Sequence, residues 1–235
     1  MKIRYIFVAL VVIALLALTG CQQAESNTIN VAGSSELTVK PDKAEVWAGI
    51  SIVKDTAQEA QNEANKVVND IIDGLRYKGI SEQDISTENL NLNEERTWTD
   101  KEGSKLVGWR ATQTLKIKTT DLTKVGEIVD VAATNGANQI NNIQFELSDV
   151  KDKEYRKQAI SEATQDARGK AEAIAESLGV KLGKIKTVSE ANYFARPYTY
   201  AMEAKAGGDM VAEAANVLPQ DVTVTANINL VYIVK

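Results

Sequence analysis

The stretch AEVWAGISIVKDTAQEAQNEANKVVNDIIDGLRYKG, residues 44–79, decides the fold class, because two periodicities meet in it. Up to Ile52, small and aliphatic residues alternate with mostly polar neighbours, and a period of two predicts a strand with one buried face. From Thr56 onward the apolar residues recur every three or four positions, which predicts an amphipathic helix. Thr56 with Glu59 forms a capping box, and Gly79 suits the position after the helix end. The stretch therefore predicts a strand followed by a helix.

The neighbouring segments continue this mixture of strands and helices. Residues 28–54 predict two strands around a turn at Lys40-Pro41-Asp42, because proline fixes φ and donates no ladder hydrogen bond. Residues 85–120 predict a long hairpin with its tip at Asp100 to Gly103. The remaining predicted elements are a helix from Asp121 to Gly136, a strand over 139–147, a helix from Asp149 to Leu178, a strand over 180–194, a loop or weak helix over 195–218, and a strand over 221–235.

The predicted order is β-β-α-β-β-α-β-α-β-β. Hairpins mixed with helices indicate the α+β class, with a largely antiparallel sheet or sheets and helices packed on one face. On the long third helix, Tyr155, Ile174 and Leu178 join the alanines of the predicted buried side. A chain of 235 residues is long enough to bury a sizeable core.

The composition excludes many familiar active sites. The chain has no histidine, which removes a Ser-His-Asp triad, a Cys-His pair, a histidine zinc site and a histidine pH switch. The single cysteine, Cys21, leaves no intramolecular disulfide and no thiolate metal cluster. A formal net charge of −5 argues against binding to nucleic acid. We therefore expect no metal, no cofactor and no nucleic-acid partner.

The first twenty residues have the layout of a signal peptide. Lys2 and Arg4 precede an uncharged apolar run from Ile6 to Leu18, which is shorter than the roughly 20 residues of a membrane span. The order Leu18-Thr19-Gly20-Cys21 resembles the lipobox of bacterial lipoproteins, in which the cysteine becomes the first residue and carries lipid on its sulfur. An uncleaved anchor, or an ordinary signal peptide with a chance cysteine, is the alternative.

The lipobox resemblance divides the chain into three parts. We expect a signal peptide over residues 1–20, a lipidated Cys21 with a flexible polar tether over 21–28, and one folded domain over 29–235. It implies export to the cell envelope and anchoring through Cys21, on the outer face of the cytoplasmic membrane or the periplasmic face of an outer membrane.

Two acidic pairs are candidates for hydrolytic chemistry, since two facing carboxylates can cleave a glycosidic bond. Glu94 and Glu95 are adjacent in a predicted strand, so their side chains point to opposite faces. Asp149 and Asp152 fall at the start of a predicted helix, where acidic groups stabilise the helix dipole. The sequence therefore favours structural roles for both pairs, and no catalytic residue is predicted.

Three turn motifs are candidate ligand sites, and each has a structural interpretation that the sequence favours. An aspartate after proline, as in Pro41-Asp42, shapes a turn, and Asp84 with Thr87 is placed to organise the chain that leaves Gly79. The segment Gly136-Ala137-Asn138 contains a glycine as a phosphate loop does, but phosphate loops precede a helix and this segment follows one. We expect it to form a C-cap turn.

The segment NYFARPYTYAM, residues 192–202, is a candidate interaction surface, because aromatics, arginine and methionine are enriched at protein interfaces. Its members are Tyr193, Phe194, Arg196, Tyr198, Tyr200 and Met202. The alternative is a loop that folds over the core of its own domain.

Five stretches in order resemble the SIMPL domain family, also called domain of unknown function 541. They are VAGSSELTVKPDKAEV with Gly33, Pro41, Asp42 and Ala44; KGISEQDIST with Gly79, Asp84 and Thr87; GWRATQTLKIK; NGANQINNIQFELSD with Gly136 and Asn138; and the alanine-rich AISEATQDARGKAEAIAESLGVKLG. The resemblance spans about residues 29 to 235, and it departs from the family at Gln220, where a turn glycine is common. The family includes periplasmic immunogenic proteins and envelope proteins linked to stress tolerance.

Together these features predict a lipid-anchored envelope protein with a non-catalytic SIMPL domain, acting as an oligomeric scaffold or interaction module. The resemblance implies a link to envelope or oxidative stress tolerance. The expected partners are the membrane, through the N-terminal lipid, and further copies of the chain. The alternative is an envelope enzyme or solute-binding protein that acts on a cell-wall or small-molecule ligand through carboxylates and loop aromatics.

Overall fold

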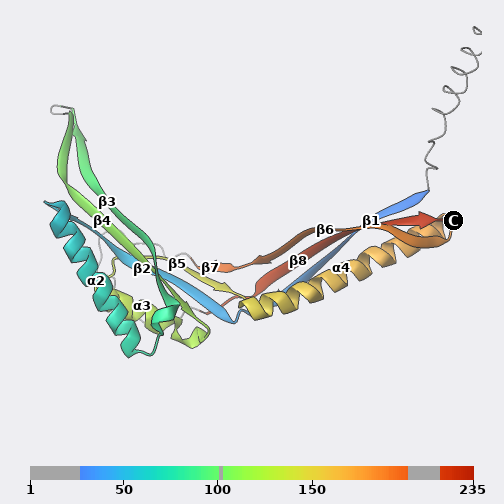
Figure 1. The fold of residues 1–235 in the computed structure, drawn as a ribbon, viewed down its shortest axis with the longest axis horizontal. Coiled ribbons are helices and arrows are strands. Elements are labelled where there is room, and N and C mark those ends of the chain that lie inside the picture. The colour runs from blue at the N-terminus through green and yellow to red at the C-terminus, as the bar shows by residue number, and fades with distance from the viewer. Residues whose placement is uncertain (1–26, 101–102, 201–217) are drawn as a thin grey trace, which may run out of the picture.

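The computed structural model describes residues 27–100, 103–200 and 218–235, except for the side chains of Asn141 and Ala191, and these residues form two lobes (Figure 1). Lobe A has a three-stranded sheet of order β1-β8-β6, and lobe B has a five-stranded sheet of order β3-β4-β2-β5-β7. All strand pairs are antiparallel. Each lobe has its own hydrophobic core.

Lobe B holds the strand and helix of the stretch 44–79. Its elements are β2 (Lys43–Lys54), α2 (Ala57–Tyr77), β3 (Ile85–Thr99), β4 (Gly103–Thr119), α3 (Val125–Thr134), β5 (Gln139–Glu146) and β7 (Tyr198–Tyr200), with 3-10 turns at Glu82–Asp84 and Leu122–Lys124. The inward residues of β2 pack against α2 and α3. At the start of α2, Thr56 Oγ1 accepts a hydrogen bond from the backbone N–H of Glu59 at 3.2 Å, so the predicted cap is confirmed.

Lobe A is built from β1 (Thr28–Val39), α4 (Asp149–Ser177), β6 (Leu182–Arg196) and β8 (Val222–Val234). Its helix packs on β1 and β8 through a stripe of fully buried alanines that includes Ala159, Ala163 and Ala167. Because these side chains are small, the helix lies against the strand at Gly33, where a Cβ atom would overlap the carbonyl oxygen of Ala163. Gly33 is therefore required by the contact between β1 and α4.

Helix α4 also covers the free edge of β1. The Asp166 carboxylate accepts a hydrogen bond from the backbone N–H of Ser34 at 2.9 Å, and Lys170 Nζ donates to the Ala32 carbonyl at 3.1 Å. Both backbone groups belong to the side of β1 that β8 leaves open. This arrangement protects the edge from pairing with another strand.

The three prolines of the chain lie where it passes between the lobes. Pro41 lies between β1 and β2, Pro197 lies between β6 and β7, and Pro219 precedes β8. A further passage, from β5 into α4, runs through Ser148, whose side chain caps α4. Proline cannot donate to a ladder, so it suits the positions where a strand leaves one sheet for the other.

The predicted α+β fold with antiparallel sheets is confirmed, and in each lobe the helices cover one face of the sheet. Three local predictions were wrong. Tyr198–Tyr200 is a strand and not loop or helix, since it pairs with β5. Asp121 caps the 3-10 turn, and α3 starts only at Val125. Ile174 and Leu178 are 40% and 67% exposed, because the buried stripe of α4 continues through Ala175.

Within the described ranges, no helix combines the length and the apolar character that crossing a membrane requires. The predicted signal peptide and Cys21 lie outside the described residues.

Candidate functional site

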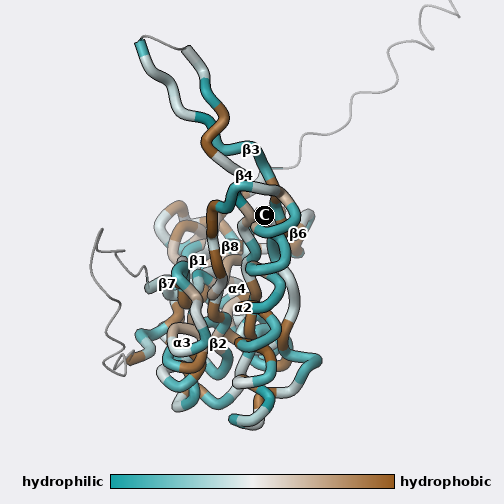
Figure 2. Tube along the Cα trace, turned by 90° about the vertical axis from the view of Figure 1, so that its left-hand side faces the viewer, coloured by the Kyte–Doolittle hydropathy of each residue, from teal (hydrophilic) through white to brown (hydrophobic). Residues whose placement is uncertain are grey.

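The hairpin of β3 and β4 extends beyond the sheet as a two-stranded arm, which we define as residues 94–100 and 103–108. The neighbouring strand β2 ends at Lys54, which pairs with Trp109, so the arm strands pair only with each other among the described strands. Figure 1 shows the hairpin rising at the end of lobe B, and Figure 2 shows that it stands clear of the rest of the molecule. An isolated two-stranded hairpin is only marginally stable in water, which makes this arm unusual.

The arm exposes large apolar side chains. Trp98 is 74% exposed, and Leu106 and Val107 are 43% and 48% exposed. The register places Arg96 opposite Leu106 and Trp98 opposite Ser104, so Arg96, Trp98 and Leu106 share one face. Tryptophan, arginine and leucine together on an exposed face are typical of a protein interface, where tryptophan and arginine often dominate binding. The arm is therefore the candidate interaction surface.

The sequence did not single out Trp98, although its position carried a signal. Trp98 lies two residues before the predicted hairpin tip, between two threonines, with charged residues nearby. An aromatic residue so close to a polar tip cannot reach a core that begins further down the hairpin.

The aromatic segment 192–202 does not form a single surface. Tyr193 is half-buried, and its hydroxyl donates a hydrogen bond to Asp152 Oδ1 at 2.8 Å, while the Arg156 guanidinium lies 4.9 Å from the ring centroid. Burial raises the pKa of Tyr193, and the hydrogen bond to Asp152 adds to this rise. Tyr198 faces the core of lobe B and stacks on Phe145, with 6.5 Å between ring centroids. Tyr193 and Tyr198 thus bind the segment to other parts of the same chain.

The other members of this segment point elsewhere or lie beyond the described residues. Phe194 is 61% exposed and pairs with Thr225, on the face of the sheet opposite Tyr193. Arg196 lies on the same face as Phe194, and Tyr200 is 41% exposed on lobe B. Met202 lies outside the described residues. The five described residues are therefore divided between two sheet faces and two lobes.

The family-motif residues take structural positions. Asn138 accepts a hydrogen bond from the Ser51 N–H and donates one to the Ser51 carbonyl, both at 2.8 Å, so it binds β2 as a neighbouring strand would. Gly136 has a φ of +97° at the end of α3, and Gly79 has a φ of +76° after α2. These backbone conformations favour glycine, which explains both motif positions.

The sequence predicted that Asp84 organises the turn that follows Gly79, but in the structure Ser81 takes this role. Ser81 Oγ accepts a hydrogen bond from the backbone N–H of Gln83 at 3.3 Å. Thr87 pairs with Leu115 inside the β3–β4 ladder. Neither Asp84 nor Thr87 is brought together with another candidate site residue.

Of the four acidic residues considered for catalysis, Asp149 lies exposed in the first turn of α4, and the other three have structural partners. The Arg110 guanidinium donates two hydrogen bonds to the Glu95 carboxylate, at 2.8 and 2.9 Å, and this pairing lowers the pKa of Glu95. Glu94 pairs with Arg96 at 2.8 Å, and Asp152 accepts the Tyr193 hydroxyl. A general acid needs a raised pKa, so the state of Glu95 is opposite to that requirement.

A second ionic group lies on the outer face of β2. Lys43 Nζ lies 3.0 Å from Glu45 Oε1 and 2.6 Å from Glu146 Oε1, and Glu45 is only 8% exposed. Burial alone would raise the pKa of Glu45, but the hydrogen bond and charge of Lys43 outweigh it and lower the pKa. No three His, Cys, Asp or Glu side chains of the described ranges gather in a way that could hold a metal ion.

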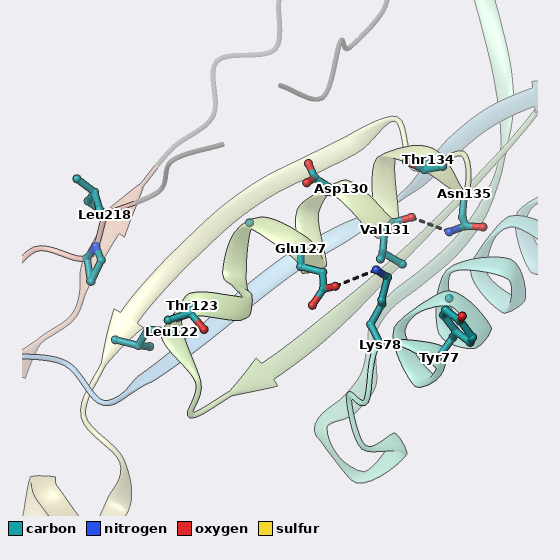
Figure 3. A pocket seen from close by; sticks show the side chains of 13 residues that line it. Tyr77, Lys78, Leu122, Thr123, Glu127, Asp130, Val131, Thr134, Asn135 and Leu218 are labelled. Carbon is teal, nitrogen blue, oxygen red and sulfur yellow. Dashed lines mark hydrogen bonds and ion pairs between the residues drawn. The ribbon is translucent and has the colours of Figure 1, made fainter. Parts of the chain in front are cut away.

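An open groove of about 910 Å³ runs over the outer face of α3, between the C-terminal end of α2 and the segment Leu218-Pro219 (Figure 3). Val131 lies at its base, and the ion pair between Lys78 and Glu127 spans it with 3.0 Å between Nζ and Oε1. Asp130 also lines the groove. A volume of this size is sufficient for a small organic ligand.

Comparison with known proteins finds relatives of similar length in bacteria. The chain is 28% identical over 169 residues to the 26 kDa periplasmic immunogenic protein of Brucella melitensis biotype 1. The matched region covers 69% of this chain and 66% of that protein, so it spans just under two thirds of the relative. It is 29% identical over 164 residues to the uncharacterized protein YggE of Edwardsiella ictaluri, covering 70% of this chain and 68% of the relative.

The YggE protein of Escherichia coli K12 is 28% identical over 205 residues, which is 83% of this chain and 82% of that protein. A family model described as a protein of unknown function, DUF541, matches residues 29–232. That range includes both lobes and the arm. Since the match covers most of the sequence, the chain belongs to the SIMPL (DUF541) family.

Proposed function

We propose that this protein is a lipid-anchored protein of the cell envelope whose SIMPL domain performs no chemistry and binds further copies of itself through the arm. The observation that carries the proposal is Trp98, which is 74% exposed on a hairpin that no other described strand supports. Burying the exposed part of such a side chain at an interface would stabilise an assembly by roughly 1–3 kcal/mol per copy.

The proposed location rests on the N-terminal sequence and on the Brucella relative, which is named a periplasmic protein. Strand β1 begins at the end of the elongated molecule that lies opposite the arm (Figure 1). A lipid on Cys21 would therefore attach the lobe A end of each copy to the membrane, and copies that lie along the membrane surface would bring the arm of one copy to lobe A of the next.

Strand β6 offers the matching surface for the arm. Ile185 and Val188 are 50% and 59% exposed, although both lie on the helix side of the sheet, because α4 packs over β1 and β8. Three register shifts along β6 make its free edge irregular, which disfavours simple strand addition. We therefore infer a contact between side chains, with the arm of one copy on β6 of the next.

A contact between two different surfaces of the same chain repeats head to tail, and it closes into a ring or continues as a filament.

The test is sedimentation of residues 27–235, which contain every described element. It compares the wild type with Trp98→Ala, Val188→Lys and the control Val150→Ala. Val150 is 75% exposed on α4, so it controls for loss of an exposed aliphatic side chain. We expect both interface variants, and not the control, to weaken association about tenfold or more.

A wild-type chain that stays monomeric at high concentration would contradict self-association. If only Trp98→Ala had an effect, the arm would bind another arm and not β6.

The lipid is tested separately by mass spectrometry of the native N-terminus, where a free thiol at Cys21 would remove the anchor from the proposal. The link to stress tolerance is tested by survival of a deletion strain under oxidant, rescued by the wild type and not by Trp98→Ala.

The alternative of an envelope enzyme acting through carboxylates has less support. The chain lacks histidine, and Glu94, Glu95 and Asp152 are engaged with Arg96, Arg110 and Tyr193. These contacts support structural work for the acidic groups and leave binding as the proposed activity.

A further inference from the structure

The groove over α3 contains one negative charge that no neighbouring group of the described residues compensates. Among the described residues, Lys78 is the only basic side chain that lines it, and it is paired with Glu127 at 3.0 Å. The other carboxylate that lines the groove belongs to Asp130, and the described residues provide no ion pair for it. Its Oδ1 atom is shielded from solvent and has no hydrogen-bond partner in the described part of the chain.

A shielded carboxylate oxygen without a donor is unfavourable, and most such groups in native proteins are satisfied. A ligand in the open groove cannot reach the shielded Oδ1, but a positively charged hydrogen-bond donor at the other carboxylate oxygen of Asp130 would stabilise the carboxylate as a whole. We propose that the groove binds a small organic cation, with an ammonium group at Asp130 and an apolar body along the surface of α3.

The rest of the groove suits this ligand better than an anion. Lys78 is occupied by Glu127, and Lys124 Nζ donates to the Lys78 carbonyl at 3.3 Å, so among the described side chains an anion would meet Asp130 without a free cation to bind it. Gly126, one helical turn before Asp130, leaves the surface of α3 there without a side chain. Figure 3 shows Tyr77 on the α2 side of the groove, where its 88% exposed ring is available to an apolar body.

The test compares 2-phenylethylamine with 2-phenylethanol, two probes of the same shape that differ in the charged group. Binding is measured by calorimetry and saturation-transfer NMR on the full chain in nanodiscs of zwitterionic lipid, with empty discs as the blank. We expect the amine to bind about tenfold more tightly than the alcohol, and added salt to reduce this preference.

Asp130→Asn keeps the shape of the side chain and removes its charge. We expect it to weaken amine binding about tenfold and to leave alcohol binding unchanged, which also shows that the variant folds. Asp149→Asn, the same change at an exposed residue of lobe A, is the matched control and should affect neither probe. Equal binding of amine and alcohol, an unaffected Asp130→Asn variant, or no binding of either probe would each overturn the proposal.

Discussion

The Asp42 carboxylate accepts two hydrogen bonds from Ser148, one from the backbone N–H and one from the hydroxyl, both at 2.7 Å. The two residues are 106 positions apart, and they lie on two different passages between the lobes. Ser148 Oγ also accepts from the Lys151 N–H at 3.4 Å and so caps α4. One carboxylate thus links the turn after β1 to the start of the helix that covers β1.

Replacing Asp42 should therefore destabilise the whole molecule and not only a turn. We expect Asp42→Ala to lower the free energy of unfolding by about 2–3 kcal/mol, because it removes two bonds to a charged acceptor and leaves Ser148 without one. Urea unfolding followed by circular dichroism measures the loss. Asp55→Asn, an exposed aspartate after β2, is the control, and an equal loss in both variants would contradict the linking role.

Two glycines of lobe A provide a matched pair. Gly33→Ala should destabilise the protein by about 2 kcal/mol or more, since the new Cβ would overlap Ala163 and lie 2.7 Å from Ala167 Cβ. Gly169 lies in α4, and a Cβ added there would have no atom within 4 Å. Gly169→Ala should therefore stabilise the protein by about 0.5–1 kcal/mol through helix propensity. Thermal unfolding compares them, and a neutral Gly33→Ala would mean that β1 and α4 separate readily.

The ionic group around Glu45 should contribute to acid sensitivity. Burial opposes ionisation of Glu45, but Lys43 lowers its pKa below the ordinary value of 4.5, so its contribution is complete above about pH 4.5 and is lost as pH falls through the lowered pKa. We expect Glu45→Gln to be less stable than the wild type at pH 7 and to approach it at pH 3. Urea midpoints measured across this range check the prediction, and a constant difference would refute it.

Tyr193 and Tyr200 should differ although both belong to the aromatic segment. Tyr193→Phe removes the hydrogen bond to Asp152 and should lower the free energy of unfolding by about 1 kcal/mol. Tyr200→Phe removes a hydroxyl from a 41% exposed side chain and should have no measurable effect on unfolding in guanidinium. Similar losses in both variants would argue against a special role for the Tyr193 hydroxyl.

Trp98 should matter for association and not for folding. Because the side chain is 74% exposed, Trp98→Ala should change the free energy of unfolding by no more than about 0.5 kcal/mol at protein concentrations where the chain is monomeric. It should also remove the tryptophan most accessible to acrylamide quenching. A large loss of stability would show instead that the arm is needed to hold β4 in the sheet.

The features that follow from local sequence were predictable. The helix of residues 57–77 has a clear period and its own capping residues, and the hairpin tip is marked by Asp100 and Gly103. Strand β8 alternates so regularly that its buried face, including Val222, Val224 and Ala226, could be read directly.

The features that depend on distant pairing were not predictable. The alternation of residues predicts on which face of the hairpin Trp98 lies. Whether the hairpin has a neighbouring strand at that position depends on the length of β2, and β2 ends at Lys54. Tyr198 points inward only because β5 lies beside it and supplies Phe145. The division into two sheets likewise depends on which strands pair across the three proline-marked passages.

The pairing of β1 with β8 has a consequence for how the protein is made. Every residue from Thr28 to Val39 pairs with a residue between Val222 and Ile233, so β1 finds its partner only after all the other described strands have been synthesised. Lobe B, whose segment 43–146 supplies all but one of its strands, can form in the meantime. A chain cut short by its last fifteen residues would keep lobe B and lose the central strand of lobe A, leaving β1 as an unpaired edge for proteases and chaperones to recognise.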